Sequence, residues 1–157
     1  MCEICDGRTF EDMLAGRAAR VAEYGYALQG VEALGGAVGW VYTAGLMDSA
    51  RHPELIMAGV PPDPAASILE AIAESILDGE RYDTGERLRL PDGHALRLGA
   101  VHPVQYERDT FAIWFGLQRT GAVRSPELAA FQVVPGAGFP GPWRRAQPRL
   151  SNPRVRL

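Results

Sequence analysis

Both cysteines of the chain lie at its N-terminus, at positions 2 and 5. A Cys-x-x-Cys pair can supply two thiolates to zinc or another thiophilic metal, form a disulfide, or pack as two small side chains. A structural zinc site takes four ligands. If Cys2 and Cys5 bind such a metal, the remaining ligands must come from His52, His94 or His102, or from the same pair in the second subunit of a homodimer.

A thioredoxin-like role does not suit this cysteine pair. In that motif the cysteines open a helix that follows a strand, and the sequence leaves no room for a strand before Cys2. We expect a cytoplasmic protein, whose thiols are kept reduced, and this disfavours a permanent disulfide between Cys2 and Cys5. Two interpretations stay open: a metal site completed by histidine or by a second subunit, and a structural role in docking the N-terminus.

A second set of reactive side chains surrounds the end of a predicted strand and the loop that follows it. Tyr42, Thr43, His52 and Glu54 could converge at this place. His52 would then be a general base oriented by a carboxylate, with Thr43 as nucleophile or hydrogen-bond donor. His102 ends another predicted strand, where its ring could point into a cleft. The alternative is structural, because tyrosine on a half-buried strand is usually core and histidine before proline is usually a turn residue.

A glycine pattern typical of dinucleotide-binding loops occurs at 136–141, after a predicted strand. Such a loop must lead into a helix whose N-terminal amides meet the pyrophosphate. Pro140 and Pro142 remove amides here, and no helical periodicity follows. We therefore expect no nucleotide cofactor.

Composition narrows the class of protein. The chain has 157 residues, of which 46% are hydrophobic and 22% charged, as in an ordinary globular domain. Its net charge of −3 argues against non-specific nucleic-acid binding. No apolar run has the length of a membrane span, and no signal sequence is evident, so we expect no membrane association and a cytoplasmic location.

The elements that must position these side chains alternate irregularly between strands and helices. Pro61, Pro62, Asp63 and Pro64 mark a helix start, with Asp63 as cap and Gly79 as stop. Residues 106–117 fit either a helix or a strand. The other predicted elements are a helix at 9–24, strands at 26–31, 40–46, 55–60 and 131–134, and a hairpin that joins 87–90 to 94–101.

This order predicts an α+β fold in which two or three helices pack on a mainly antiparallel sheet. We expect a single domain over residues 1–134. Residues 135–157 are rich in proline, glycine and arginine, and they predict an irregular C-terminal tail that packs on the domain or trails from it. Its arginines could contact the acidic surface of a protein partner.

The sequence resembles an uncharacterised bacterial family, domain-of-unknown-function family 4262. The resemblance rests on the cysteine-containing start and on residues 39–46, 52–55, 59–62 and 131–134, followed by Phe139, Pro140 and Trp143. Members usually show a Gln-Val-Val-Trp-Pro-Asp-like run where this chain has Val134, Pro135 and Gly136. The resemblance implies one intact domain and no particular activity.

Three functions remain open. The first is a small binding or regulatory domain whose Cys2 and Cys5 hold a metal. The second is an enzyme with a cleft site around four residues: Tyr42, Thr43, His52 and Glu54. The third is a partner-binding accessory or immunity-type protein without chemistry.

Overall fold

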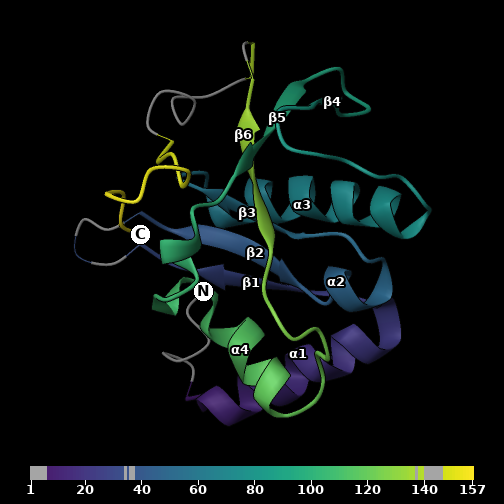
Figure 1. Ribbon diagram of the computed structural model, residues 1–157, viewed down its shortest axis with the longest axis vertical. Coiled ribbons are helices and arrows are strands. Elements are labelled where there is room, and N and C mark those ends of the chain that lie inside the picture. Colours follow the sequence, from purple (N-terminus) through teal and green to yellow (C-terminus); the bar gives the residue numbers. More distant parts are fainter. Residues whose placement is uncertain (1–6, 34, 36–37, 137, 140–146) are drawn as a thin grey trace.

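The computed structural model describes residues 7–33, 35, 38–136, 138–139 and 147–157, which form one α+β domain (Figure 1). The predicted fold class is thereby confirmed. The strands are β1 (Ala27–Val31), β2 (Trp40–Ala44), β3 (Glu54–Ala58), β4 (Arg87–Arg89), β5 (Ala95–Ala100) and β6 (Ala130–Pro135). The α-helices are α1 (Phe10–Tyr24), α2 (Leu46–Ser49), α3 (Pro62–Leu77) and α4 (Ala112–Arg119). In the described part of the chain, no helix is long and apolar enough to cross a membrane.

The strands form one sheet in the order β1-β2-β3-β6-β5-β4. Neighbouring strands are antiparallel except β3 and β6, which pair in parallel. The last strand of the sequence therefore lies in the middle of the sheet, between the β1–β3 meander and the predicted β4–β5 hairpin (Figure 1). This placement brings residue 54 beside residue 130.

One face of the sheet is covered by α3, whose stripe of buried residues packs over β1, β2 and β3. The stripe follows helical spacing and consists of Ala65, Ile68, Leu69, Ile72, Ala73 and Ile76. The helix starts two residues earlier than predicted, with Pro61 as N-cap and Pro62 as its first residue. Asp63 is therefore not the cap. It lies in the first turn, where its negative charge interacts favourably with the positive end of the helix dipole.

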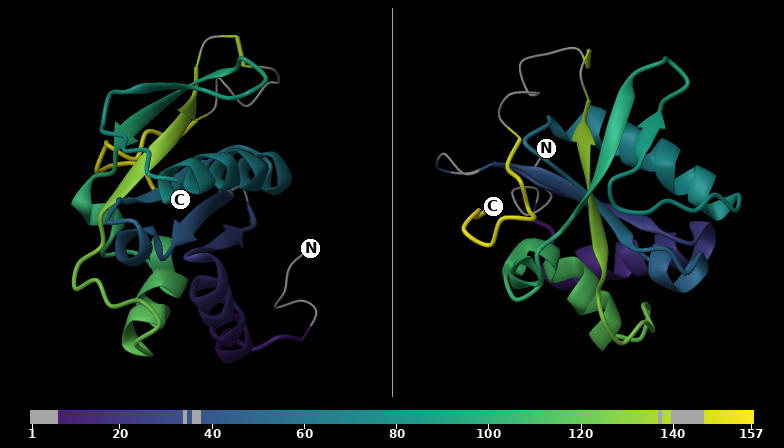
Figure 2. Two further views of the ribbon diagram at one scale, coloured as in Figure 1. Left: turned by 90° about the vertical axis from the view of Figure 1, so that its right-hand side faces the viewer. Right: turned by 45° about the horizontal axis from the view of Figure 1, so that its top comes forward.

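The opposite face is covered by α1 and α4 (Figure 2). Thr9 caps α1 in a capping box: Asp12 N donates to Thr9 Oγ1 over 3.1 Å, and Thr9 N donates to Asp12 Oδ2 over 2.9 Å. The two helices approach closely at Gly116, where a Cβ atom would lie 2.5 Å from Leu14 Cδ2. In the ambiguous segment 106–117, residues 109–111 form a 3₁₀ turn and residues 112–117 belong to α4, whereas residues 106–108 are turn and bend. Phe111 and Trp114 are completely buried.

The described part of the C-terminal segment, residues 147–157, packs on the same face as α4. Leu150 is completely buried. Gln132 in β6 donates to Pro148 O over 2.6 Å and accepts from Leu150 N over 2.9 Å. Arg108 donates to Val155 O. This stretch is therefore attached to the domain through the buried Leu150 and these hydrogen bonds, while most of its other residues lie at the surface.

Candidate functional site

The most unusual side chain in the described interior is Glu54, at the first position of β3. It is completely buried. Thr43 Oγ1 donates to Glu54 Oε2 over 2.7 Å, and Gly45 N donates to Glu54 Oε1 over 2.8 Å. Three longer contacts, each of 3.3 Å, come from the backbone N–H groups of Leu46 and Met47 and from the indole Nε1 of Trp114. One carboxyl group thus faces five donors.

The turn that supplies three of these donors depends on Gly45. This residue has φ +118°, and a Cβ atom there would lie 2.8 Å from Gly25 O. Only glycine tolerates both conditions without strain. The turn it makes between β2 and α2 directs consecutive N–H groups at the Glu54 carboxyl, so the local backbone is built around this side chain.

Burial and hydrogen bonding act on Glu54 in opposite directions. Burial raises the pKa of the Glu54 carboxyl, while the hydrogen bonds, led by that from Thr43, lower it, and burial prevails. Among the described residues, no arginine forms an ion pair with Glu54. The carboxyl is therefore held by neutral donors alone.

Thr43 and Tyr42 are also buried, and their hydroxyl groups are hydrogen-bonded within the core. Thr43 is completely buried; besides donating to Glu54, it accepts from Leu55 N over 2.8 Å. The Tyr42 hydroxyl accepts from Ile113 N over 3.0 Å, and its ring meets Phe111 edge-on with centroids 5.0 Å apart. Thr43 thus ties β2 to β3, and Tyr42 ties β2 to the start of α4. The structure does bring Tyr42, Thr43 and Glu54 into one region, but within the core.

His52 is buried apart from Glu54 and bonds to other groups. Its Nδ1 lies 2.8 Å from Pro53 O, and its Nε2 accepts from Tyr82 N over 3.3 Å. These two contacts assign the neutral tautomer with hydrogen on Nδ1. Burial lowers the pKa of the His52 imidazole. The ring packs edge-on against Phe131, with centroids 5.8 Å apart. His52 therefore has no hydrogen bond to Thr43 or Glu54.

His102 begins a short 3₁₀ turn on the C-terminal side of β5. Its Nδ1 accepts from Val104 N over 3.2 Å, and its backbone N–H donates to Leu150 O over 2.8 Å. The ring is half-buried. It makes no hydrogen bond with Glu54 or His52, so the structure does not unite the predicted catalytic candidates into one constellation.

The predicted metal ligands Cys2 and Cys5 lie outside the described residues. Within the described ranges, no three histidine, cysteine, aspartate or glutamate side chains come together as a metal site. Both ring nitrogens of His52 are already engaged, and His94 Nδ1 contacts Asp92 Oδ2 at 2.9 Å. Among the described residues, neither His94 nor His102 shows a hydrogen bond at Nε2. His102 Nδ1 accepts from Val104 N, so the hydrogen of its neutral ring lies on Nε2, whereas His94 Nδ1 can donate to Asp92 and leave Nε2 as the acceptor. His94 therefore suits a metal better than His102 does.

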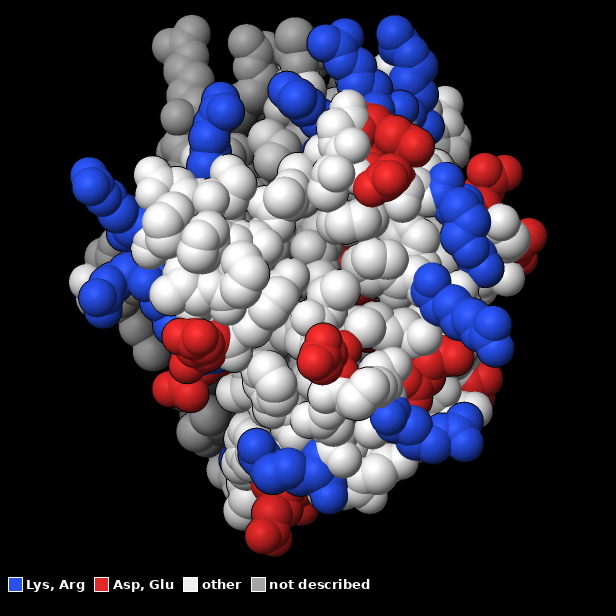
Figure 3. All heavy atoms as spheres, viewed as in Figure 1, with Lys and Arg blue, Asp and Glu red and all other residues white. Residues whose placement is uncertain are grey.

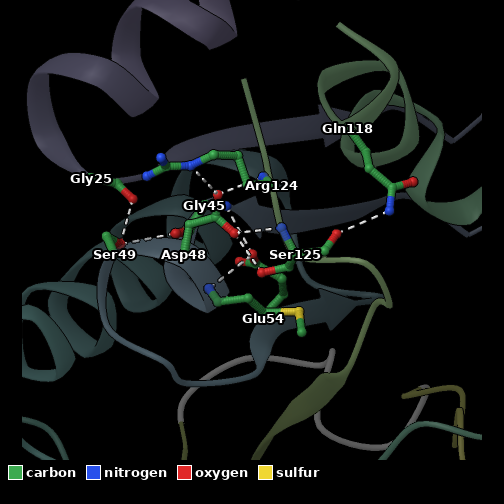
Figure 4. A network of polar contacts seen from close by, with 9 residues as sticks. Gly25, Gly45, Asp48, Ser49, Glu54, Gln118, Arg124 and Ser125 are labelled. Atoms are coloured by element: carbon green, nitrogen blue, oxygen red, sulfur yellow. Dashed lines mark hydrogen bonds and ion pairs between the residues drawn. The ribbon is translucent and has the colours of Figure 1, made fainter. Parts of the chain in front are cut away.

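A second polar cluster around α2 carries no signal in the sequence (Figure 4). Asp48 accepts from Arg124 N over 2.6 Å, from Ser125 N over 2.8 Å and from the Ser125 hydroxyl. Partial burial raises the pKa of Asp48, but these hydrogen bonds outweigh it and hold the pKa below its ordinary value. On the other side of α2, Ser49 Oγ donates to Gly25 O over 2.7 Å. Partners so distant along the chain leave no recognisable spacing.

Comparison with known proteins yields one match. The family model of the domain of unknown function (DUF4262) matches residues 20–134, which is more than half of the chain. Neither the curated proteins nor the solved structures include a match. The matched range contains the Glu54 cluster and all six strands except the end of β6.

Proposed function

This chain belongs to the domain-of-unknown-function family DUF4262, and we propose that it is a cytoplasmic binding domain of a regulatory or accessory kind. The observation that supports this function is the state of Thr43 and Glu54. Both are completely buried, and their polar atoms are already bonded to neighbouring groups of the fold. A nucleophile needs access to a substrate, whereas the Thr43 hydroxyl is buried and, together with Glu54, holds β2, β3 and α2 together.

The proposal is tested by the native mass of the protein at its natural expression level. We expect the chain to elute in a complex clearly heavier than its own 17.0 kDa, with a stoichiometric partner identified by mass spectrometry. Elution as a lone chain under these conditions would contradict a binding function.

The enzyme hypothesis requires its own test, because a binding protein can also react. The variants Thr43→Val and Glu54→Gln remove the hydroxyl and the charge while they nearly keep the shape of each side chain. Wild type and variants are incubated with a metabolite extract, and substrate loss is followed by mass spectrometry. We expect no metabolite to change. Turnover by wild type that disappears in Thr43→Val would instead establish an enzyme.

A second candidate function is metal binding by Cys2 and Cys5, which the Cys-x-x-Cys spacing supports. The site for zinc or another thiophilic metal would be completed by one of the three histidines or by the same pair of a second subunit in a homodimer. Elemental analysis of protein purified without a histidine tag measures the metal content. We expect about one metal per chain or per two chains, lost in the double variant Cys2→Ser and Cys5→Ser. Metal-free wild-type protein of unchanged stability would rule this function out.

A further inference from the structure

The two faces of the β4–β5 hairpin differ in character. Leu88, Leu96 and Leu98 point toward the core under α3. Arg87, Arg89 and Arg97 alternate with these leucines and are exposed, so they occupy the opposite face. Basic side chains accordingly gather over the hairpin, at the top of the view in Figure 3, whereas the middle of that view is largely uncharged. We call these three residues the arginine face.

Arg87 and Arg97 are direct neighbours across the two strands. Leu98 N donates to Glu86 O, and Leu90 N donates to His94 O. Hydrogen-bonded pairs alternate along this ladder with pairs that lack mutual hydrogen bonds, and Arg87–Arg97 is of the second kind. In antiparallel sheets the pairs without mutual hydrogen bonds have the closer side chains, and like charges there are destabilising. Among the described residues, neither arginine has an acidic partner at ion-pair distance.

The same alternation exposes the backbone at the edge of the sheet. β4 is an edge strand, and within the described part of the chain no strand pairs with its outer side. Because Glu86, Leu88 and Leu90 bond inward to β5, the N–H and C=O groups of Arg87 and Arg89 point outward. An extended chain can pair with those groups.

Protection of the edge explains only part of this arrangement. A short strand with charged residues, followed by Pro91, is a common defence against unwanted strand pairing. Arg87 and Arg89 suit that role. Arg97 does not, because it lies on β5, which is paired on both sides, and its charge adds repulsion without shielding an edge.

We propose that the arginine face and the outer edge of β4 bind an extended, acidic segment of a partner protein by strand addition. This inference rests on the proposed binding function and names the partner's chemistry. Carboxylates at alternate positions of the added strand would lie on the face that carries Arg87 and Arg97, where guanidinium groups can hold them in pairs of hydrogen bonds.

The charge distribution favours such a partner over a second copy of the chain. Residues 87–157 contain 11 basic and 4 acidic residues, a net charge of +7, whereas residues 1–86 contain 5 basic and 15 acidic residues, a net charge of −10. The net positive charge of residues 87–157, which include the hairpin, favours an acidic partner over a basic one. Pairing of β4 with β4 of a second copy would instead place arginine against arginine.

The test uses a fluorescein-labelled peptide in which glutamate alternates with valine, titrated with the full chain and followed by anisotropy. We expect binding that weakens with salt, and an affinity about tenfold lower for Arg97→Gln and for Arg87→Gln. Arg119→Gln, an exposed arginine of α4 with the same change of charge, is the matched control and should bind as wild type does. Thermal unfolding verifies that Arg97→Gln is folded, which we expect because it removes a like-charge contact.

Three outcomes would overturn the proposal. Equal affinity of wild type and Arg97→Gln excludes the arginine face, and undiminished binding of a peptide with alternate amides methylated excludes strand addition. Tighter binding of a single-stranded DNA oligonucleotide than of the peptide assigns the face to nucleic acid. If the native complex persists in Arg97→Gln, this inference fails while the binding function stands; if no native complex exists, the binding function itself fails.

Discussion

Among single residues, Glu54 and His52 are two buried ionisable groups whose pKa values burial shifts, upward for Glu54 and downward for His52. Glu54 faces only donors, and His52 uses one nitrogen to donate and the other to accept. Each therefore contributes to stability through its protonation state as well as through its contacts.

Replacing Glu54 by glutamine tests the role of the carboxyl. The glutamine amide replaces one carboxyl oxygen with an NH₂ group, which donates hydrogen bonds and cannot accept them. This NH₂ group would face backbone N–H donors of the turn at 45–47. We expect Glu54→Gln to lower the free energy of unfolding by about 2 kcal/mol, the cost of leaving buried donors unpaired. Urea denaturation measures it. Glu70→Gln on the exposed side of α3 should change stability very little, and equal effects of the two variants would show that the cluster is not structural.

Because burial lowers the pKa of His52, we expect the free energy of unfolding to depend on pH in a specific way. The folded-state pKa of His52 lies below its ordinary value of 6.5, so the unfolded chain binds this proton first as the pH falls. The stabilisation that neutral His52 contributes is fully present above about pH 6.5, the ordinary pKa of histidine. It is lost as the pH falls from there toward the lower pKa that His52 has in the folded protein. Denaturation of wild type and His52→Gln at about pH 7 and about pH 5 should show a smaller loss in the variant. Parallel losses would mean that His52 is protonated equally in both states.

At the scale of elements, the β2–α2 turn decides whether the Glu54 cluster can form. Gly45→Ala combines an unfavourable positive φ with a contact of 2.8 Å to the Gly25 carbonyl oxygen. We expect a loss of about 1–3 kcal/mol or more in the free energy of unfolding. Gly16→Ala is the matched control, because no atom lies within 4 Å of its added Cβ in the middle of α1. That variant should gain about 0.5–1 kcal/mol; a stable Gly45→Ala would contradict the strained turn.

At the scale of the whole molecule, the C-terminal segment completes the core on the α4 side of the sheet. Leu150 is completely buried, and Gln132 bonds to the backbone around it. We expect Leu150→Ala to cost about 2–5 kcal/mol, and removal of residues 147–157 to cost more, measured by chemical denaturation. Arg156→Ala, at an exposed position of the same segment, serves as control. Unchanged stability of Leu150→Ala would show that the segment is dispensable for folding.

This result changes how a role of the C-terminal arginines is tested. Deleting the segment would remove core contacts together with the charges, so loss of a partner would not identify the contact. Substitution of exposed arginines one at a time separates the two effects.

Elements whose stability is local could be predicted from the amino-acid sequence. The helix predicted at 9–24, the helix predicted from the proline run at 61–64 and the β4–β5 hairpin depend on neighbours a few positions away, and all three form, although Asp63 is not the cap of α3. The α+β class follows from their order. The gathering of Tyr42, Thr43 and Glu54 was also foreseen, since they flank one strand and its loop.

Which of these side chains meet, and whether they meet in a cleft or in the core, depends on how distant elements pack together. The parallel pairing of β3 with β6 and the contact of Asp48 with Ser125 join residues about half the chain apart, and no local pattern encodes such a distance. The same holds for His52, which lies close to Glu54 in sequence yet bonds to Tyr82 instead. Periodicity fixes the direction of a side chain relative to its own strand, but its partners depend on how distant elements pack.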